Sequence, residues 1–588
     1  MPAARRLAPS KASSTGRPGG APDGPYAEPF AADVTKRLVF SSWAATPTAV
    51  ATLLSYEAER RIAEGSRLAE NTPAARRSIA NRLAYNLGGG RPEAMTTLAL
   101  FWPMPGLAAL ADPLTRARHA AQPLSAAAVE TAVAAELAHQ PPDKPTGRAA
   151  GAETSYWAAA LGRADSLPDD LAADDGRTRI IAGLTGQTDD EDEPRADPAG
   201  LHAHVSLALQ AREDGVDLSS SSPPPDLSDT LAAIALHSPA NIAWRALGRL
   251  VSDQPAVTPA GHWIAAAVLA SGLRSLFNRV ETTLLIDRLL PDSVYWRAVL
   301  RYCAWGNLQA VLDEYLHHLA VAEGAVTLDD DRLAELADAA AKAIAVRPSV
   351  YQAFDPMHAD RGIPLTARFA LRYGGRPQDE ESARQPETRQ AFNSPFWPFI
   401  LATTSVGQEG IDFHWWSHAV VHWNTPPNPV DFEQREGRVN RYGGHAVRRN
   451  IAHRHRDDIL AADDPNPWRA AYHVATDETE RLGEFAPHWV YPGPARIERH
   501  LAPYPLSVDT TRFDRLKDDV ALYRLTFGQP RQEDMLELLR RRGVRHEAGR
   551  MNALRLDLAP HVANSDMASR ALPDDSLSTS PVPLAWAA

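Results

Sequence analysis

A short segment near residue 440 carries side chains that suit a polyphosphate. It reads Gln434-Arg435-Glu436-Gly437-Arg438-Val439-Asn440-Arg441. Asn428 and Pro429 are typical of a helix start. A helix running on from them would place Gln434, Arg438 and Arg441 on one face, at positions i, i+4 and i+7. Two fixed guanidiniums and an amide directed at one spot suit a polyphosphate. Gly437 on the same face would let another surface come close.

A second polar segment precedes it, Gly407-Gln408-Glu409-Gly410-Ile411-Asp412. Its glycines expose backbone, and Glu409 and Asp412 add two carboxylates. Backbone amides and carboxylates together suit a sugar or a phosphate. The two segments therefore predict one site, provided that the fold brings them together.

Short apolar runs predict the strands that must position both segments. They cover 37–41, 367–373, 399–403 and 418–423. Helical patterns alternate with these runs, starting at Thr46-Pro47, near Glu380 and at Asn428. Strand, turn and helix repeated in this way predict an α/β fold, a doubly wound parallel sheet. Ligands bind at the carboxyl ends of the strands in such sheets, and both polar segments follow a strand.

The sheet pattern is interrupted by a long stretch with helical periodicity. No loop of a compact domain is this long, so we expect a helical domain inserted into the sheet domain. The 588-residue chain is then divided as follows: disordered tails at 1–32 and 560–588, a sheet domain from 33–62 and 364–460, a helical insertion over 63–363, and a helical extension over 461–559. Within the extension, Thr511 to Phe527 and Pro530 to Leu539 predict two paired helices.

The composition limits the classes of partner. The net charge is −12, with 61 basic and 73 acidic residues, which argues against a generally basic nucleic-acid-binding surface. Any contact with nucleic acid must therefore be local. The single cysteine, Cys303, cannot form an internal disulfide, which favours the cytoplasm. We found neither a secretory signal nor an apolar run long enough to span a membrane, so we expect a soluble protein.

Three segments resemble motifs of superfamily 2 helicases. Ala402 to Phe413 resembles motif V, and Gln434 to Arg441 has the Q-x-x-G-R-x-x-R spacing of motif VI. Arg37 to Trp43 stands where motif IV is expected. The residues in these motifs are most similar to those of the Swi/Snf-like branch and of the bacterial RNA-polymerase-associated ATPase. The resemblance covers 33–62 and 364–455 and weakens beyond.

The resemblance implies a RecA-like lobe, the second of two lobes that clamp ATP between them. Arg438 and Arg441 would be its arginine fingers, and such a finger is worth ~10³–10⁵ in rate. The other residues that the resemblance assigns to the nucleotide are Gln434, Gly437, Gly410, Asp412 and Glu409. Those that it assigns to the DNA or RNA backbone are Thr404, Ser405 and Gly407, a contact that does not read sequence.

The chain departs from that family at the ATP-binding motifs. A working ATPase needs a G-x-x-x-x-G-K-[ST] phosphate loop and a D-E-x-[HD] magnesium box. The sequence has no Gly-Lys dipeptide, and its Asp-Glu pairs lack the fourth residue of the box. We therefore expect ATP and Mg²⁺ to be bound mainly by a separate first lobe. No hydrolysis is expected from this chain alone.

The sequence is also compatible with two other functions. The lobe could be an inactive remnant that acts as a scaffold, with a protein partner bound by the helical insertion. It could also bind nucleic acid without ATP, and the sequence does not distinguish DNA from RNA.

Several other polar and aromatic groups have both a functional and a structural interpretation. His453 and His455 with Asp457 and Asp458 could hold a metal, but no further ligand set is apparent, so we predict a polar loop and no metal site. The basic residues Arg448, Arg449, Arg454 and Arg456 fit either a phosphate contact or a solvated face. We expect structural roles for His414, His418 and His422, which would alternate on one strand. Trp415, Trp416 and Trp423 could stack on bases, but core packing is the commoner role of such aromatics.

Overall fold

The computed structural model describes residues 35–64, 66, 72–139, 152–172, 176–185, 198–214, 223–325, 327–355, 357–374, 384–404, 411–477, 483, 485–502, 504, 507–525, 538 and 541. The expected disordered tails, 1–32 and 560–588, lie outside these residues. No helix in the described part is long and apolar enough to cross a membrane.

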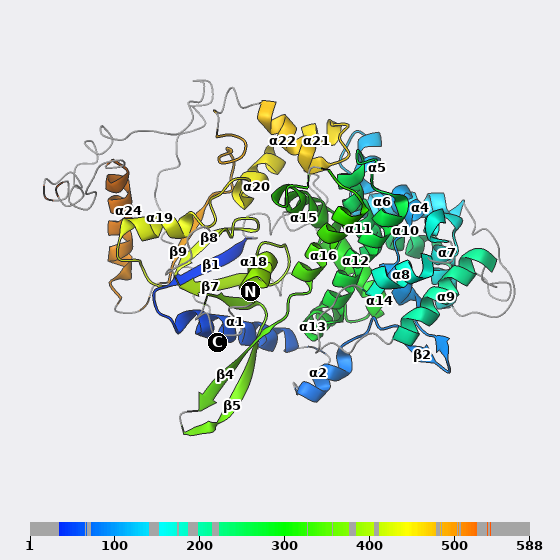
Figure 1. The fold of residues 1–588 in the computed structure, drawn as a ribbon, viewed down its shortest axis with the longest axis horizontal. Helices are drawn as coiled ribbons and strands as arrows, with labels where there is room; N and C mark the ends of the chain where they lie inside the picture. The colour runs from blue at the N-terminus through cyan, green and yellow to red at the C-terminus, as the bar shows by residue number, and fades with distance from the viewer. Residues whose placement is uncertain are drawn as a thin grey trace.

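A five-stranded parallel sheet forms one end of the described structure (Figure 1). Its order is β6 (Ala370–Tyr373), β7 (Ile400–Thr404), β1 (Lys36–Ser41), β8 (Ser417–His422) and β9 (Glu498–Leu501). Every neighbouring pair in it is parallel. The strands expected near 37–41, 367–373, 399–403 and 418–423 are confirmed as β1, β6, β7 and β8. The fifth strand, β9, lies in the segment that we expected to be helical.

Side chains alternate between the two faces of the sheet. Leu38 of β1 pairs with Leu401 and Val420 in the neighbouring strands, and all three belong to one buried cluster. The next residue, Val39, packs on the opposite face with Ala402. Both faces are therefore buried, as parallel sheets require.

Further helices occur in the same parts of the chain as these strands. Their bounds are α1 (Thr46–Ala63), α18 (Gln385–Phe392), α19 (Pro429–Glu436), α20 (His445–Arg454), α21 (Arg456–Ala461), α22 (Pro467–Asp477) and α24 (Asp509–Leu525). The predicted start at Thr46 is confirmed. The helix expected over Thr511 to Phe527 is confirmed as α24, whose Leu516 and Val520 pack on Phe432 of α19. Its expected partner, Pro530 to Leu539, lies outside the described residues except for Leu538.

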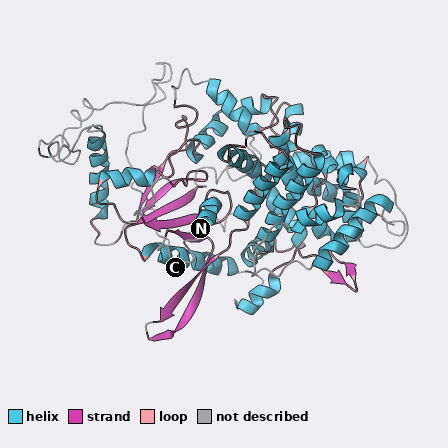
Figure 2. Cartoon of the chain, viewed as in Figure 1, coloured by secondary structure: helices cyan, strands magenta, loops and turns pink. Residues whose placement is uncertain are grey.

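A mass of helices fills the other end of the molecule (Figure 2). We call it the helical unit, residues 73–344. Its bounds are α2 (Pro73–Ile79), α3 (Met95–Phe101), α4 (Pro105–Leu110), α5 (Pro113–His119), α6 (Ala126–Ala138), α7 (Ala152–Leu161), η2 (Ala164–Ser166), η3 (Asp169–Leu171), α8 (Gly176–Thr185), α9 (Pro198–Asp214), α10 (Leu227–His237), α11 (Pro239–Val251), α12 (Pro259–Asn278), α13 (Val280–Leu289), α14 (Tyr295–Trp305), α15 (Leu308–Ala322) and α16 (Asp330–Ile344). One contiguous core spans it and also includes Trp416, which directly precedes β8.

Two hairpins interrupt the region that we expected to be helical. A short one joins β2 (Leu87–Gly88) to β3 (Arg91–Pro92), and a longer one joins β4 (Ser349–Asp355) to β5 (His358–Ala367). The longer hairpin projects from the body of the molecule (Figure 1). Val350 and Phe354 of β4 are exposed. Because its apolar residues are not all buried, their spacing does not identify this strand in the sequence.

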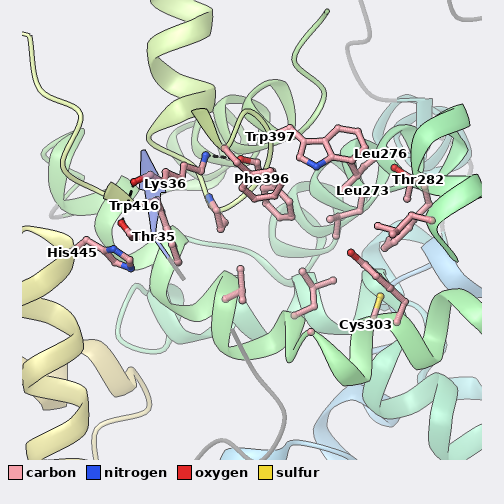
Figure 3. A pocket seen from close by; sticks show the side chains of 18 residues that line it. Thr35, Lys36, Leu273, Leu276, Thr282, Cys303, Phe396, Trp397, Trp416 and His445 are labelled. Carbon is pink, nitrogen blue, oxygen red and sulfur yellow. Dashed lines mark hydrogen bonds between the residues drawn. The ribbon is translucent and has the colours of Figure 1, made fainter. Parts of the chain in front are cut away.

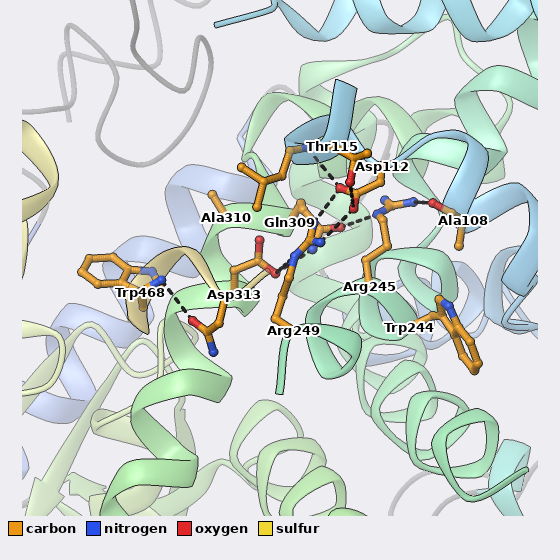
Figure 4. A network of polar contacts seen from close by, with 12 residues as sticks. Ala108, Asp112, Thr115, Trp244, Arg245, Arg249, Gln309, Ala310, Asp313 and Trp468 are labelled. Carbon is orange, nitrogen blue, oxygen red and sulfur yellow. Dashed lines mark hydrogen bonds and ion pairs between the residues drawn. The ribbon is translucent and has the colours of Figure 1, made fainter. Parts of the chain in front are cut away.

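A buried polar network joins α5, α11 and α15 inside the helical unit (Figure 4). Arg249 donates to both carboxylate oxygens of Asp112, at 2.6 and 2.8 Å. Arg245 donates to Gln309, which in turn donates to Asp313 at 2.8 Å. Burial raises the pKa of Asp313 to about 6, against the opposing effect of the Arg249 charge.

We predict that Asp112→Ala destabilises the chain by about 3–5 kcal/mol, because Arg249 would be left charged and buried. Burial alone would raise the pKa of Asp112, but hydrogen bonds and charge from Arg249 outweigh it and lower the pKa to about 2. The stabilisation should therefore be complete above about pH 4, the ordinary pKa of the group, and be lost as the pH falls toward 2. Urea unfolding across this range measures both effects.

The control is Asp165→Ala. Asp165 pairs with Arg163 at the surface, where their side chains are 46% and 23% exposed. Such a pair contributes at most ~1 kcal/mol. Equal losses in the two variants, or a loss for Asp112→Ala that does not change with pH, would contradict the prediction.

Candidate functional site

Helix α19 begins where the sequence predicts but ends earlier. Asn428 caps it by accepting the Asp431 N–H at 2.8 Å, and Pro429 is its first residue. The helix ends at Glu436, and Gly437 follows as its cap. A turn follows, in which the Glu436 carbonyl accepts the Val439 N–H at 3.0 Å and the Asn440 N–H at 3.1 Å.

The expected single helical face carrying Gln434, Arg438 and Arg441 is therefore wrong. Glycine favours the end of a helix, and Val439 is completely buried in the core of the sheet. Burying Val439 turns the chain inward after Gly437, so that both arginines lie in the segment after the helix. Gln434 stays exposed on the last turn of α19.

Among the described residues, Gly437 has room for a Cβ. A Cβ placed there would meet only the Gln434 and Glu433 carbonyl oxygens of the described chain, each at 3.4 Å. The expectation that another surface could approach at Gly437 is compatible with this geometry.

Arg438 joins the segment after α19 to the segment before β8. Its Nη1 donates to the Ile411 carbonyl at 3.3 Å, and its own carbonyl accepts the Phe413 N–H at 2.9 Å. The two polar segments of the sequence are thus in direct contact. Arg438 is half-buried between them.

Arg441 pairs with Asp412. The distance from Nε of Arg441 to Oδ1 of Asp412 is 2.8 Å, and the two side chains are 37% and 35% exposed. A pair this exposed contributes at most ~1 kcal/mol, so its main effect is to orient the guanidinium. Asn393 donates to the Asp412 carbonyl at 2.9 Å and holds the acidic partner in place.

The other predicted site residues are only partly described. Thr404 is the last residue of β7, in register with Ser41 at the end of β1, so it lies at the carboxyl edge of the sheet. Ser405, Gly407, Glu409 and Gly410 fall within 405–410, outside the described residues. The structure thus brings together Asp412, in the segment between β7 and β8, and Arg438 and Arg441, in the segment after α19.

The sequence does not indicate the role of Arg435, which lies on α19 just before these arginines. It is buried, donates to the Asn424 carbonyl at 3.0 Å and lies 5.5 Å from the ring centre of Phe40. Burial lowers its pKa to about 10. Arg435 also donates to the Ser42 hydroxyl at 3.5 Å, so it connects α19 to the residues that follow β1 and β8.

Arg448 contradicts both interpretations of the basic cluster. It is neither solvated nor available to a phosphate, because its side chain is 1% exposed and its Nε pairs at 2.7 Å with Glu314 of α15, which is 2% exposed. It also donates to the Gly443 carbonyl at 2.9 Å and to the Trp415 carbonyl. One buried arginine therefore connects the helical unit to the loop that follows Arg441.

Gly443 fixes that loop from a second direction. Its φ of +60° favours glycine, and a Cβ there would lie 3.3 Å from the Tyr472 hydroxyl oxygen. Its N–H donates to the His488 carbonyl at 2.8 Å. The turn after Arg441 is thus held on one side by Arg448 and on the other by His488.

The histidines near the sheet have structural positions. His418 and His422 lie in β8, whereas His414 precedes the strand, so the three do not all alternate on it. His418 contacts His445 through their Nδ1 atoms at 2.9 Å. Burial, followed by the Arg435 charge, lowers the pKa of His422 to about 3. A neutral His422 fits its stacking on Phe432, with ring centres 4.7 Å apart.

The remaining candidates are also engaged in packing. His455 is buried and contacts Tyr491 and, at 3.0 Å, Asp458. Among the described residues there is no group of three side chains that could hold a metal ion. Trp416 belongs to the core of the helical unit, and Trp415 and Trp423 are half-buried.

A cavity of about 430 Å³ lies at the amino ends of the strands (Figure 3). Lys36 at the start of β1, Phe399 just before β7 and Trp416 just before β8 line it, together with Leu273 and Cys303 of the helical unit. Burial lowers the pKa of Lys36 far below its usual value. Lys36, Phe399 and Trp416 mark the amino ends of the strands, and His445, four residues after Arg441, lines the cavity as well.

Comparison with known proteins gives one family match. Residues 365–443 match the family described as helicase conserved C-terminal domain. The matched range includes β6, β7, β8 and α19 and ends just after Arg441. No match was found among curated proteins or among solved structures. The match supports a helicase-related role for an α/β unit, and β1, outside the matched range, completes the middle of its sheet.

We predict that Glu314→Gln and Arg448→Met each destabilise the chain. Arg448→Met leaves the Glu314 carboxylate buried without its partner, and Glu314→Gln leaves the guanidinium without a countercharge, with a cost of about 3–5 kcal/mol in either case. The double variant should recover part of the loss, because neither charge of the pair remains. Chemical denaturation of the four proteins measures the coupling.

Glu335→Ala is the matched control. Glu335 pairs with Arg332 on α16, and their side chains are 65% and 38% exposed, so we expect a loss below ~1 kcal/mol. Strictly additive losses in the double variant would show that Arg448 and Glu314 do not act as a pair.

Proposed function

We propose that the sheet unit is the second RecA-like lobe of an ATP-dependent helicase or translocase of superfamily 2. Arg441 and Arg438 would act as arginine fingers toward ATP held by a first lobe. The observation that carries the proposal is the contact between the two predicted motifs. The Arg438 carbonyl accepts the Phe413 N–H at 2.9 Å, and Arg441 pairs with Asp412 at 2.8 Å.

The local chemistry fits a phosphate at Arg441. Among its guanidinium nitrogens, only Nε has a hydrogen-bond partner within the described part of the chain, and the side chain is 37% exposed. A planar guanidinium held at one nitrogen can still present its terminal nitrogens to a phosphate oxygen. The weak pair with Asp412 would orient Arg441 until a phosphate competes for it.

The same residues do not fit Mg²⁺. The Asp412 carboxylate is taken by Arg441, and no group of three carboxylates or histidines occurs among the described residues. The sequence also lacks a phosphate loop and a magnesium box. We therefore assign the metal and most of the ATP contacts to a first lobe outside these 588 residues.

ATP, when bound, supplies the phosphoryl group that is transferred to water. This chain would contribute positive charge where negative charge develops in the transition state. Gln434 and Gly437 would flank the nucleotide from α19. Thr404, with Ser405 and Gly407, would contact a DNA or RNA backbone at the carboxyl edge of the sheet.

One observation favours a scaffold as the alternative function. In this structure the guanidinium of each proposed finger already bonds within the chain, Arg438 to Ile411 and Arg441 to Asp412. An inactive remnant would keep both bonds permanently. Its partner would then bind through the helical unit, and neither arginine would matter for binding.

We predict no ATP turnover by the chain alone and turnover in a complex with an ATP-binding lobe. The test uses a polypeptide that carries a phosphate loop and a magnesium box and co-purifies with the chain. In that complex Arg441→Ala should lower kcat by ~10³–10⁵, the range for an arginine finger. Arg438→Ala should also abolish most turnover. Release of phosphate in the presence and absence of DNA and RNA measures these rates.

Arg332→Ala is the control, since Arg332 lies on α16 in an exposed pair with Glu335. It should leave kcat unchanged. Rapid turnover by the isolated chain would overturn the need for a separate lobe. An unchanged kcat in Arg441→Ala would remove the finger and favour the scaffold.

A further inference from the structure

A column of four aromatic rings stands beside the proposed phosphate-binding arginine. It runs from Tyr442 through His488 and Tyr472 to His317, with ring centres 4.5, 5.2 and 6.2 Å apart and interplanar angles of 13°, 19° and 21°. Each ring is thus nearly parallel to the next. The inner end belongs to α15, and the outer end is the residue that directly follows Arg441.

The outer end of the column is open. Tyr442 is 52% exposed even though one face of its ring lies on His488. Trp489, which is 46% exposed, meets the same ring nearly edge-on, at 81° and 6.2 Å. His488 covers one face of the Tyr442 ring, and about half of the Tyr442 surface is still exposed to solvent.

The ring of Tyr442 is also held in a fixed orientation. The next residue, Gly443, bonds to the His488 carbonyl and to the buried Arg448. Burial lowers the pKa of His488, so the supporting imidazole is neutral at neutral pH. A ring fixed in this way loses little conformational freedom when a second ring stacks on it.

We propose that Tyr442 is the stacking platform for the base of the nucleotide whose phosphates Arg441 contacts. This inference rests on the proposed function and adds a base subsite to it. Adjacent residues supply the two chemistries of one nucleotide, a flat π surface for the base and a guanidinium for the phosphates. Stacking does not depend on which base is present, because every base has a π face.

A mononucleotide fits the arrangement better than a nucleic-acid strand. A strand needs successive rings along a basic groove, whereas the column presents a single outer face. The charged residue next to Tyr442 in the chain is Arg441, which is paired with Asp412. One base and its phosphates account for both residues.

The test compares ATP with inorganic tripolyphosphate as ligands of the full-length chain. Ligand-observed NMR gives both affinities, and saturation transfer to the adenine protons reports on the base. Tyr442→Ala should weaken ATP binding ~5- to 150-fold, the range for one stacked base, and leave tripolyphosphate binding unchanged. Tyr442→Phe keeps the ring and should retain ATP binding. Trp305→Ala, at the exposed end of α14, should change neither affinity.

Arg441→Ala should weaken the binding of both ligands, and this variant separates the two proposals. If it has no effect while Tyr442→Ala acts on ATP alone, the base subsite stands and the phosphate role of Arg441 fails. If Tyr442→Ala changes both affinities equally or neither, the base subsite is wrong although the proposed function can stand. Failure of the chain to bind ATP overturns the inference. The inference is also wrong if Tyr442→Ala loses binding to oligothymidylate, a single-stranded DNA, while its ATP binding is intact.

Discussion

The buried ion pair between Arg448 and Glu314 is the contact on which the candidate site depends. It joins the helical unit to the loop that presents Arg441, and both side chains are almost completely excluded from water. A buried charge without a partner costs several kcal/mol, so neither residue can leave the other without a large loss. The helical unit thereby helps to set the position of the loop, and it contacts the candidate site even though it lies between β1 and β6 in the sequence.

Around this fixed contact the site itself is held loosely. Arg441 and Asp412 are about one-third exposed, and such a pair is worth little. This contrast suits a residue that must exchange partners, because a guanidinium in a deeply buried pair could not turn to a phosphate. The buried Arg435 and Arg448 hold the segments before and after it in place. The ring column from Tyr442 to His317 adds a second connection to α15. The chain thus uses its arginines in two ways, as buried connectors and as exposed ligands.

The sequence predicts the parts of this fold that depend on local patterns. The apolar strands next to both motifs are confirmed, as is the Asn428 cap. Prediction from the sequence fails where residues distant in the chain determine the structure. Helix α19 ends at Glu436 and Val439 is buried in the sheet core, and no local pattern indicates that burial. Arg448 was misread because its partner lies 134 residues away. The half-buried strand β9 and the exposed hairpin of β4 and β5 carry weak periodicity, so neither was foreseen.

The most direct test is a cryo-electron microscopy structure of the chain with its ATP-binding lobe and a non-hydrolysable ATP analogue. We predict that a terminal nitrogen of Arg441 lies within hydrogen-bonding distance, about 2.7–2.9 Å, of a γ-phosphate oxygen. The Arg448–Glu314 pair should be unchanged in that complex. A nucleotide bound between the lobes with Arg441 still paired to Asp412 and facing away from the phosphates would contradict the account.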